Sequence, residues 1–149
     1  MKRLSAAFAL LITTACQTVQ DPALNVTSAP ILQGDPVQIT LTNLEPGSPV
    51  TLTLEEIKLR RGAPAFYTST ATFTVPDNGT LDTETRAPIS GSYDGVAQAG
   101  LFWSRRRPDD RQPTEDTPLD PLTLTVDLES DGTPDFTQDI DLITSLPAV

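Results

Sequence analysis

The residue types that most often carry enzymatic chemistry are scarce in this sequence of 149 residues. It has no histidine, and its only cysteine is Cys16. A Ser-His-Asp or Cys-His relay needs an imidazole to take the proton of the nucleophile. The Gly-x-Ser-x-Gly spacing of a nucleophile elbow is also missing, because Ser92 follows Gly91 directly. We therefore expect no enzymatic activity, and we assign no catalytic residue.

Two groups of carboxylates offer other chemistry. Glu55 and Glu56 are neighbours, but neighbouring strand residues point to opposite faces, so the two face one substrate only if a bulge turns them. The acidic hairpin 127–135 has a spacing faintly like that of a calcium loop, yet position 12 counted from Asp127 is Gln138 rather than Glu. An ordinary acidic hairpin is the favoured interpretation. We predict no metal site and no cofactor, and calcium binding by this hairpin stays open.

Large apolar residues gather in a glycine-rich stretch, "GSYDGVAQAGLFWS", at residues 91–104. Tyr93, Leu101, Phe102 and Trp103 must pack against something. Strand parity predicts that Leu101 and Trp103 enter the core while Phe102 points away from it. Trp103→Ala is then expected to lower the free energy of unfolding by about 3–5 kcal/mol.

A basic cluster follows this stretch at Arg105, Arg106 and Arg107. It could hold an anionic headgroup or an acidic partner, although acidic residues follow closely and a solvated loop is the commoner outcome. We take Phe102 with these three arginines as the candidate contact edge, and the identity of a protein partner stays open.

The first sixteen residues have the layout of a bacterial lipoprotein signal peptide. Lys2 and Arg3 precede the apolar run "LSAAFALLI", which is too short to span a bilayer, and small residues then lead to Cys16. We expect the signal peptide, residues 1–16, to be cleaved just before Cys16, which becomes the new N-terminus and receives a lipid on its thiol. Residues 17–22 are expected to form a tether. Gln17 after the cysteine favours the outer membrane, facing the periplasm. Ordinary secretory cleavage is the alternative.

The charge of the chain restricts its partners. The formal net charge is −10, and the first sixteen residues hold two of the ten basic residues and none of the 20 acidic ones. The remainder therefore carries about −12, which would repel nucleic-acid phosphates. We predict no nucleic-acid partner, and a single cysteine excludes an intramolecular disulfide.

Apolar and polar residues alternate with the period of half-buried strands. The clearest segments are 37–41, 50–54, 71–75, 122–128 and 140–142. Ile57 and Leu59 take the opposite parity to Val50–Leu54, so the pattern slips at Glu55–Glu56, which predicts a β-bulge or a strand that switches sheets. About seven short strands predict an all-β, antiparallel β-sandwich. A barrel is the second choice.

Several segments resemble, in order, the N-terminal domain of the acyl-CoA thioester hydrolase / bile acid-CoA:amino acid N-acyltransferase (BAAT) family. They are "GDPVQITLTNLEPGSPVTLTL", "STATFTVPDNGTLD" and "GSYDGVAQAGLFWS", at residues 34–54, 69–82 and 91–104. The resemblance implies an immunoglobulin-like sandwich over residues 23–149. In that family a separate α/β-hydrolase domain holds the nucleophile, Asp and His, and none of those residues transfers to a position in this sequence.

Two functions follow as expectations. The first is an exported lipoprotein, anchored to the membrane through Cys16, whose sandwich is a non-catalytic binding or structural module. The second is a regulatory or accessory part of a thioester hydrolase or acyltransferase system whose hydrolase domain is on another chain. Acyl-CoA is a cytosolic metabolite, which speaks against the second function for an exported protein.

Overall fold

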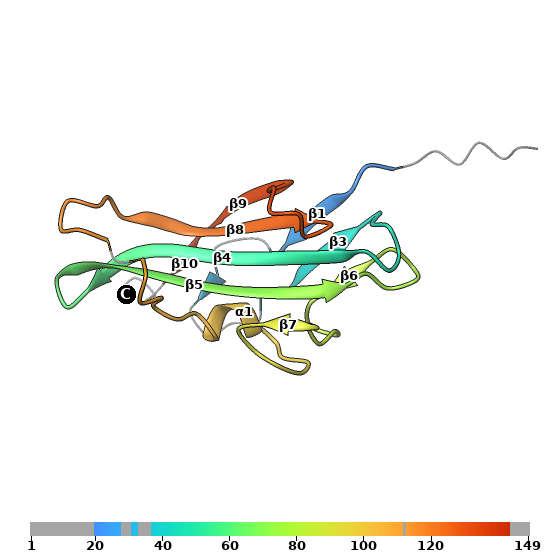
Figure 1. The fold of residues 1–149 in the computed structure, drawn as a ribbon, viewed down its shortest axis with the longest axis horizontal. Helices are drawn as coiled ribbons and strands as arrows, with labels where there is room; N and C mark the ends of the chain where they lie inside the picture. The colour runs from blue at the N-terminus through green and yellow to red at the C-terminus, as the bar shows by residue number, and fades with distance from the viewer. Residues whose placement is uncertain (1–19, 28–30, 33–36, 112, 144–149) are drawn as a thin grey trace, which may run out of the picture.

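The structure is a computed structural model that describes residues 20–27, 31–32, 37–111 and 113–143. These residues form strands and one short helix (Figure 1). In chain order they are β1 Ala23–Val26, β2 Ile31–Leu32, β3 Ile39–Thr42, β4 Pro49–Arg60, β5 Ala63–Thr74, β6 Leu81–Asp82, β7 Ser90–Gly91, α1 Gly100–Trp103, β8 Asp120–Leu128, β9 Phe136–Ile140 and β10 Leu142–Ile143.

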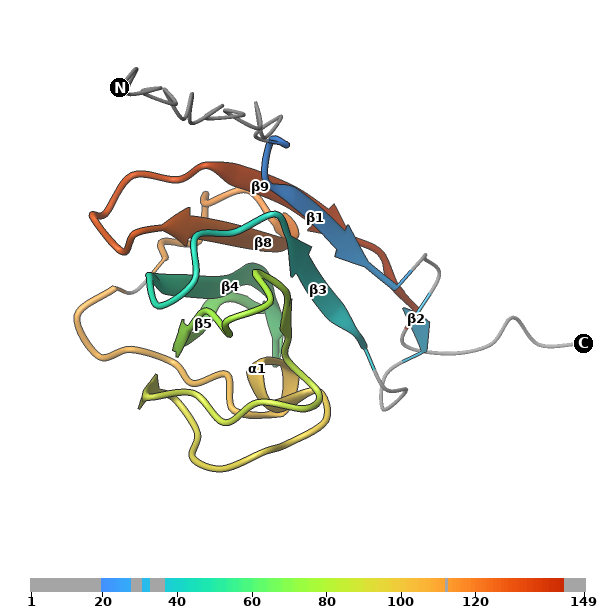
Figure 2. The same cartoon turned by 90° about the vertical axis from the view of Figure 1, so that its right-hand side faces the viewer.

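The strands form two antiparallel sheets and one parallel pair. The larger sheet has the order β7-β5-β4-β8-β9, and the smaller has the order β1-β3-β6. β2 follows β1 and pairs in parallel with β10, so the N-terminal segment joins one layer to the end of the other (Figure 2). The prediction of an all-β antiparallel sandwich is confirmed, and the barrel is not formed.

The core lies between the two sheets. Alternate residues of β4, β5 and β8 point inward, as the sequence pattern predicts, and meet the inward residues of β3 and β6. Side chains that are fully buried there include Leu52, Leu54, Phe73, Leu124 and Val126 from the larger sheet, and Ile39, Leu41 and Leu81 from the smaller. Burying each of these side chains stabilises the fold by about 2–3 kcal/mol relative to exposing it.

The predicted β-bulge is present, but its extra residue is on the partner strand. Glu55 is paired with Thr123 and Ile57 with Asp120, so two steps along β4 match three along β8. Pro121 lies in that gap, where its missing N–H removes a ladder donor. β4 itself keeps its alternation: Glu56 is buried on the same face as Leu54, and Leu59 is 58% exposed. β4 therefore does not switch sheets at the slip.

Candidate functional site

The glycine-rich stretch begins as an edge strand on β5. Gly91 is paired with Ala71 and Ser90 with Thr72, and the Ser92 N–H donates to the carbonyl of Thr70 at 2.7 Å. Gly91 has φ +142°, and a Cβ there would lie 2.3 Å from the Thr70 carbonyl oxygen. A residue with a side chain therefore cannot bring the backbone this close to β5, which explains the glycine.

The aromatic part of the stretch folds over a second close contact. The Tyr93 ring lies against Gly100, where a Cβ would come within 2.5 Å of the ring. Tyr93 is buried, and burial raises its pKa from 10.0. Ala99 has φ +52° and precedes α1, which lies against β5 and β4 (Figures 1 and 2). The stretch is thus a loop that packs against β5 and β4 and contributes Leu101 to the core.

The predicted division of roles between Phe102 and Trp103 is wrong. Leu101 is buried at 2% exposure, as predicted, but Trp103 is 63% exposed and Phe102 is half-buried against the core. The physical reason is that residues 100–103 form a helical turn, in which successive side chains turn by about 100° rather than by the 180° of a strand. The Trp103 ring leans on Tyr93, with centroids 5.9 Å apart.

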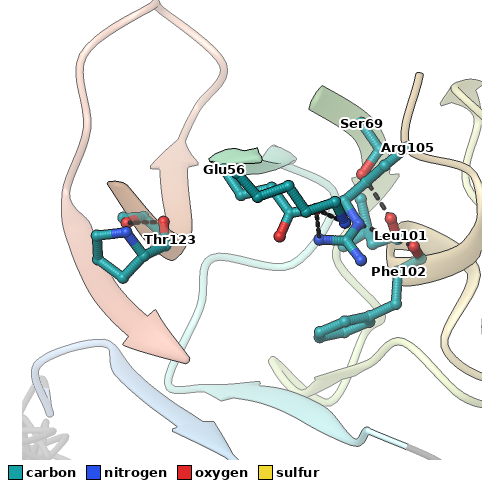
Figure 3. A network of polar contacts seen from close by, with 8 residues as sticks. Glu56, Ser69, Leu101, Phe102, Arg105 and Thr123 are labelled. Atoms are coloured by element: carbon teal, nitrogen blue, oxygen red, sulfur yellow. Dashed lines mark hydrogen bonds and ion pairs between the residues drawn. The ribbon is translucent and has the colours of Figure 1, made fainter. Parts of the chain in front are cut away.

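A buried ion pair joins this loop to the larger sheet. The Arg105 Nη1 lies 2.7 Å from the Glu56 Oε1, and both side chains are 10% exposed (Figure 3). The Lys58 Nζ also contacts Glu56, and Arg105 Nε donates to the carbonyl of Phe102 at 2.9 Å. Next to the pair, the buried Ser69 hydroxyl donates to the carbonyl of Leu101 at 2.6 Å. Arg105 is therefore a structural residue that holds the loop, which corrects its assignment to an exposed contact edge.

The other two predicted contact arginines remain at the surface. Arg106 forms an isolated antiparallel bridge with Thr68, in which each backbone N–H donates to the partner's carbonyl. The side chains of Arg106 and Arg107 are exposed. The exposed edge of this loop is therefore Trp103, Arg106 and Arg107. Sequence reasoning misplaced Trp103, and no pattern signalled the helical turn in four residues.

The two adjacent glutamates do not form a catalytic pair. As predicted, they point to opposite faces of the sheet: Glu56 faces inward, whereas Glu55 pairs with Arg111 Nη1 at 3.0 Å on the outer face. The Arg111 guanidinium lies 3.9 Å from the centroid of the Phe66 ring. Glu55 borders an open hollow of about 430 Å³ on this face, together with Phe66, Arg111, Asp120, Thr123 and Asp139. The two carboxylates thus share no cation: Arg111 binds Glu55, whereas Arg105 and Lys58 bind Glu56.

The carboxylates of the acidic hairpin bind its own backbone. Asp127 accepts from the N–H groups of Asp131 and Gly132 at 3.1 and 2.7 Å, and Asp135 accepts from the N–H of Leu128 at 2.7 Å. Within the described ranges, no three His, Cys, Asp or Glu side chains are grouped so that they could hold a metal ion. The local bonds account for the acidic spacing of a tight β8–β9 turn.

The predicted lipidation site, Cys16, lies outside the described residues, as do residues 1–16 as a whole. Among the residues that the structure does describe, none belongs to a helix of the length and apolarity needed to cross a membrane.

Comparison with known proteins places the chain in a family. Residues 34–142 match the family model described as the acyl-CoA thioester hydrolase/BAAT N-terminal region. No curated protein matches the chain. The matched range includes β3 to β9, the glycine-rich loop and the Glu56–Arg105 ion pair. The chain therefore belongs to the acyl-CoA thioester hydrolase/BAAT N-terminal region family.

Proposed function

We propose that this protein is an exported lipoprotein whose sandwich is a non-catalytic binding module in the bacterial cell envelope. The observation that carries the proposal is the position of the only thiol: Cys16 follows two positive residues and a short apolar run. The absence of histidine from the sequence supports the non-catalytic part of the proposal. The lipid would hold the protein at the outer membrane, facing the periplasm.

The geometry of the domain supports a binding role rather than catalysis. The two adjacent glutamates, Glu55 and Glu56, lie on opposite faces of the sheet, and each is engaged by cations. The exposed indole of Trp103 and the neighbouring Arg106 are instead the residue types that are enriched in binding hot spots. We assign them as the contact edge for a protein partner, and we assign no contact with nucleic acid.

An accessory role in a thioester hydrolase or acyltransferase system is the second candidate, and family membership favours it. In this role, a hydrolase domain on another chain would supply the nucleophile, Asp and His. Capture of partners from a detergent-solubilised membrane fraction separates the two candidates. Recovery of a hydrolase chain by the wild-type protein, and its loss with Trp103→Ala, would favour the accessory role.

Membrane attachment is expected to depend on one thiol. In Cys16→Ser the lipid has no acceptor, so the protein should leave the membrane fraction or remain unprocessed at a higher mass. Fractionation and mass spectrometry of the intact protein measure both. Unchanged processing and unchanged membrane partition in this variant would contradict lipidation.

The purified protein is expected not to hydrolyse acyl-CoA or simple thioesters above the rate of buffer. The physical reason is that the domain has no imidazole as base and no thiol as nucleophile after the signal segment. Release of free thiol, followed with a colorimetric reagent, measures the rate. Activity that co-purifies with the protein through successive columns would contradict the non-catalytic assignment.

A further inference from the structure

The β4–β5 hairpin ends in a tip that the sandwich does not cover. The last pair between β4 and β8 is Ile57 with Asp120, whereas β4 and β5 continue to pair as far as Arg60 with Ala63. All six residues of the tip, Lys58–Ala63, are exposed, and Leu59 is 58% exposed. At the end of the projecting hairpin Leu59 has no core to enter, so its side chain is available for contact.

The tip also carries a local excess of positive charge. Lys58, Arg60 and Arg61 are three cations within four residues, in a chain whose net charge is −10. The sequence has no acidic residue between Glu56 and Asp77. Among the described residues, Arg60 and Arg61 form no ion pair, whereas Lys58 contacts Glu56 and lies 4.7 Å from the centroid of the Tyr67 ring.

The opposite end of the same hairpin is acidic. The acidic hairpin 127–135 has four carboxylates, those of Asp127, Glu129, Asp131 and Asp135. It lies beside the start of β4, because Val50 pairs with Leu128 and the Thr51 hydroxyl is 2.7 Å from that of Ser130. From Thr51 to Arg60, nine steps of 3.3 Å along β4 separate the acidic hairpin from the tip by roughly 30 Å. An anionic surface would therefore repel the acidic hairpin. At the tip's own end the attraction is local to Lys58, Arg60 and Arg61, because the carboxylate residue Asp120 is also there, paired with Ile57.

We propose that the hairpin tip Lys58–Ala63 docks on an anionic lipid surface. Basic residues bind lipid phosphates, and an exposed leucine between them is suited to the boundary between headgroups and acyl chains. A protein partner fits the tip less well, because a stable protein interface takes about 20–30 residues from each side and the tip offers six.

This proposal is independent of the lipid on Cys16. Of the residues before β1, the described ones, 20–22, lie at the other end of the sandwich, where Asn43 Nδ2 donates to the carbonyl of Asp21 and Ala23 pairs with Thr42. A protein held through its N-terminus would thus present the tip away from its attachment. Failure of lipidation would leave the docking of the tip unchanged.

The test measures co-sedimentation of the full chain, without lipid, with vesicles of equal parts phosphatidylglycerol and phosphatidylcholine, and with vesicles of phosphatidylcholine alone. Arg61→Glu keeps the N-terminal segment, with Lys2, Arg3 and its apolar run, so comparison with this variant removes any lipid binding by that segment. We expect binding that depends on phosphatidylglycerol and decreases with added salt. Arg61→Glu should weaken the partition by about tenfold.

Two matched variants control for total charge and total apolar surface. Arg86→Glu makes the same charge change away from the tip and should bind as the wild type does. Leu59→Ser should weaken binding several-fold, whereas Ile89→Ser, which changes an isoleucine that is 65% exposed just before β7 and away from the tip, should not. Thermal melts confirm that all four variants are folded.

Two results would overturn the proposal. The first is equal binding by Arg61→Glu and Arg86→Glu, which would mean that the tip is not the contact. The second is binding to polyglutamate but not to anionic vesicles, lost in Arg61→Glu, which would assign the tip to an acidic protein instead.

Discussion

Replacing Glu56 with alanine is expected to lower the free energy of unfolding by about 3–5 kcal/mol, the range for breaking a buried ion pair from one side. The Arg105 guanidinium would lose its carboxylate while its side chain is only 10% exposed. Lys58 would be affected less, because its side chain is 47% exposed and can return to water. Urea denaturation followed by tryptophan fluorescence, which Trp103 supplies, measures the change.

Glu55→Ala is the matched control, because it removes the same side chain one residue earlier. Its partner is Arg111, and the two side chains are 38% and 62% exposed. An exposed pair of this kind contributes about 0–1 kcal/mol. Equal destabilisation by the two alanine variants would show that the Glu56–Arg105 pair is not the determinant.

A paired replacement separates stability from positioning. Glu56→Leu with Arg105→Met removes both charges and keeps apolar volume, and such replacements are often neutral or stabilising. If the double variant recovers the unfolding free energy but no longer holds residues 91–111 against β5, shown by faster amide exchange at Arg106, the pair serves to position the loop. The amide of Arg106 is a suitable probe because it donates to the carbonyl of Thr68 at 2.8 Å.

The strands were predictable because their periodicity is local. Leu122, Leu124 and Val126 alternate with threonines, and this pattern alone places them on the buried face of β8. The bulge was also signalled, at Glu55–Glu56, but the extra residue is on β8. The sequence slip on β4 gives only the place where the register changes, and the partner strand, with Pro121, takes the irregularity.

The contacts of the loop were not predictable for a different reason. The partner of Glu56 lies in a loop far along the chain, and no local pattern indicates that Arg105 turns inward while Arg106 stays at the surface. A single helical turn is also too short to show a period of 3.6 residues. Strand parity therefore predicts Trp103 in the core, whereas the helical turn leaves it 63% exposed.

Leu101→Ala is expected to lower the free energy of unfolding by about 2–5 kcal/mol, the range for truncating a buried leucine. Leu101 is 2% exposed and belongs to the main core cluster, and its carbonyl accepts the buried Ser69 hydroxyl. The cavity would lie under α1, where the backbone has little room to collapse because Gly100 is already in contact with the Tyr93 ring. Thermal and urea denaturation measure the loss.

Trp103→Ala tests the same loop from its outer side and should cost less than about 1 kcal/mol, as is usual for surface substitutions. Its indole is 63% exposed, and its described ring contact is the tilted one with Tyr93. The comparison shows which side chains of the loop are buried. If both Leu101 and Trp103 were in the core, as strand parity predicts, each variant would lower the free energy of unfolding by several kcal/mol. A large loss for Leu101→Ala with a small one for Trp103→Ala places the core beneath the loop and leaves the indole free for contact. Circular dichroism at the melting transition suits both variants, because it does not depend on the tryptophan that one of them lacks.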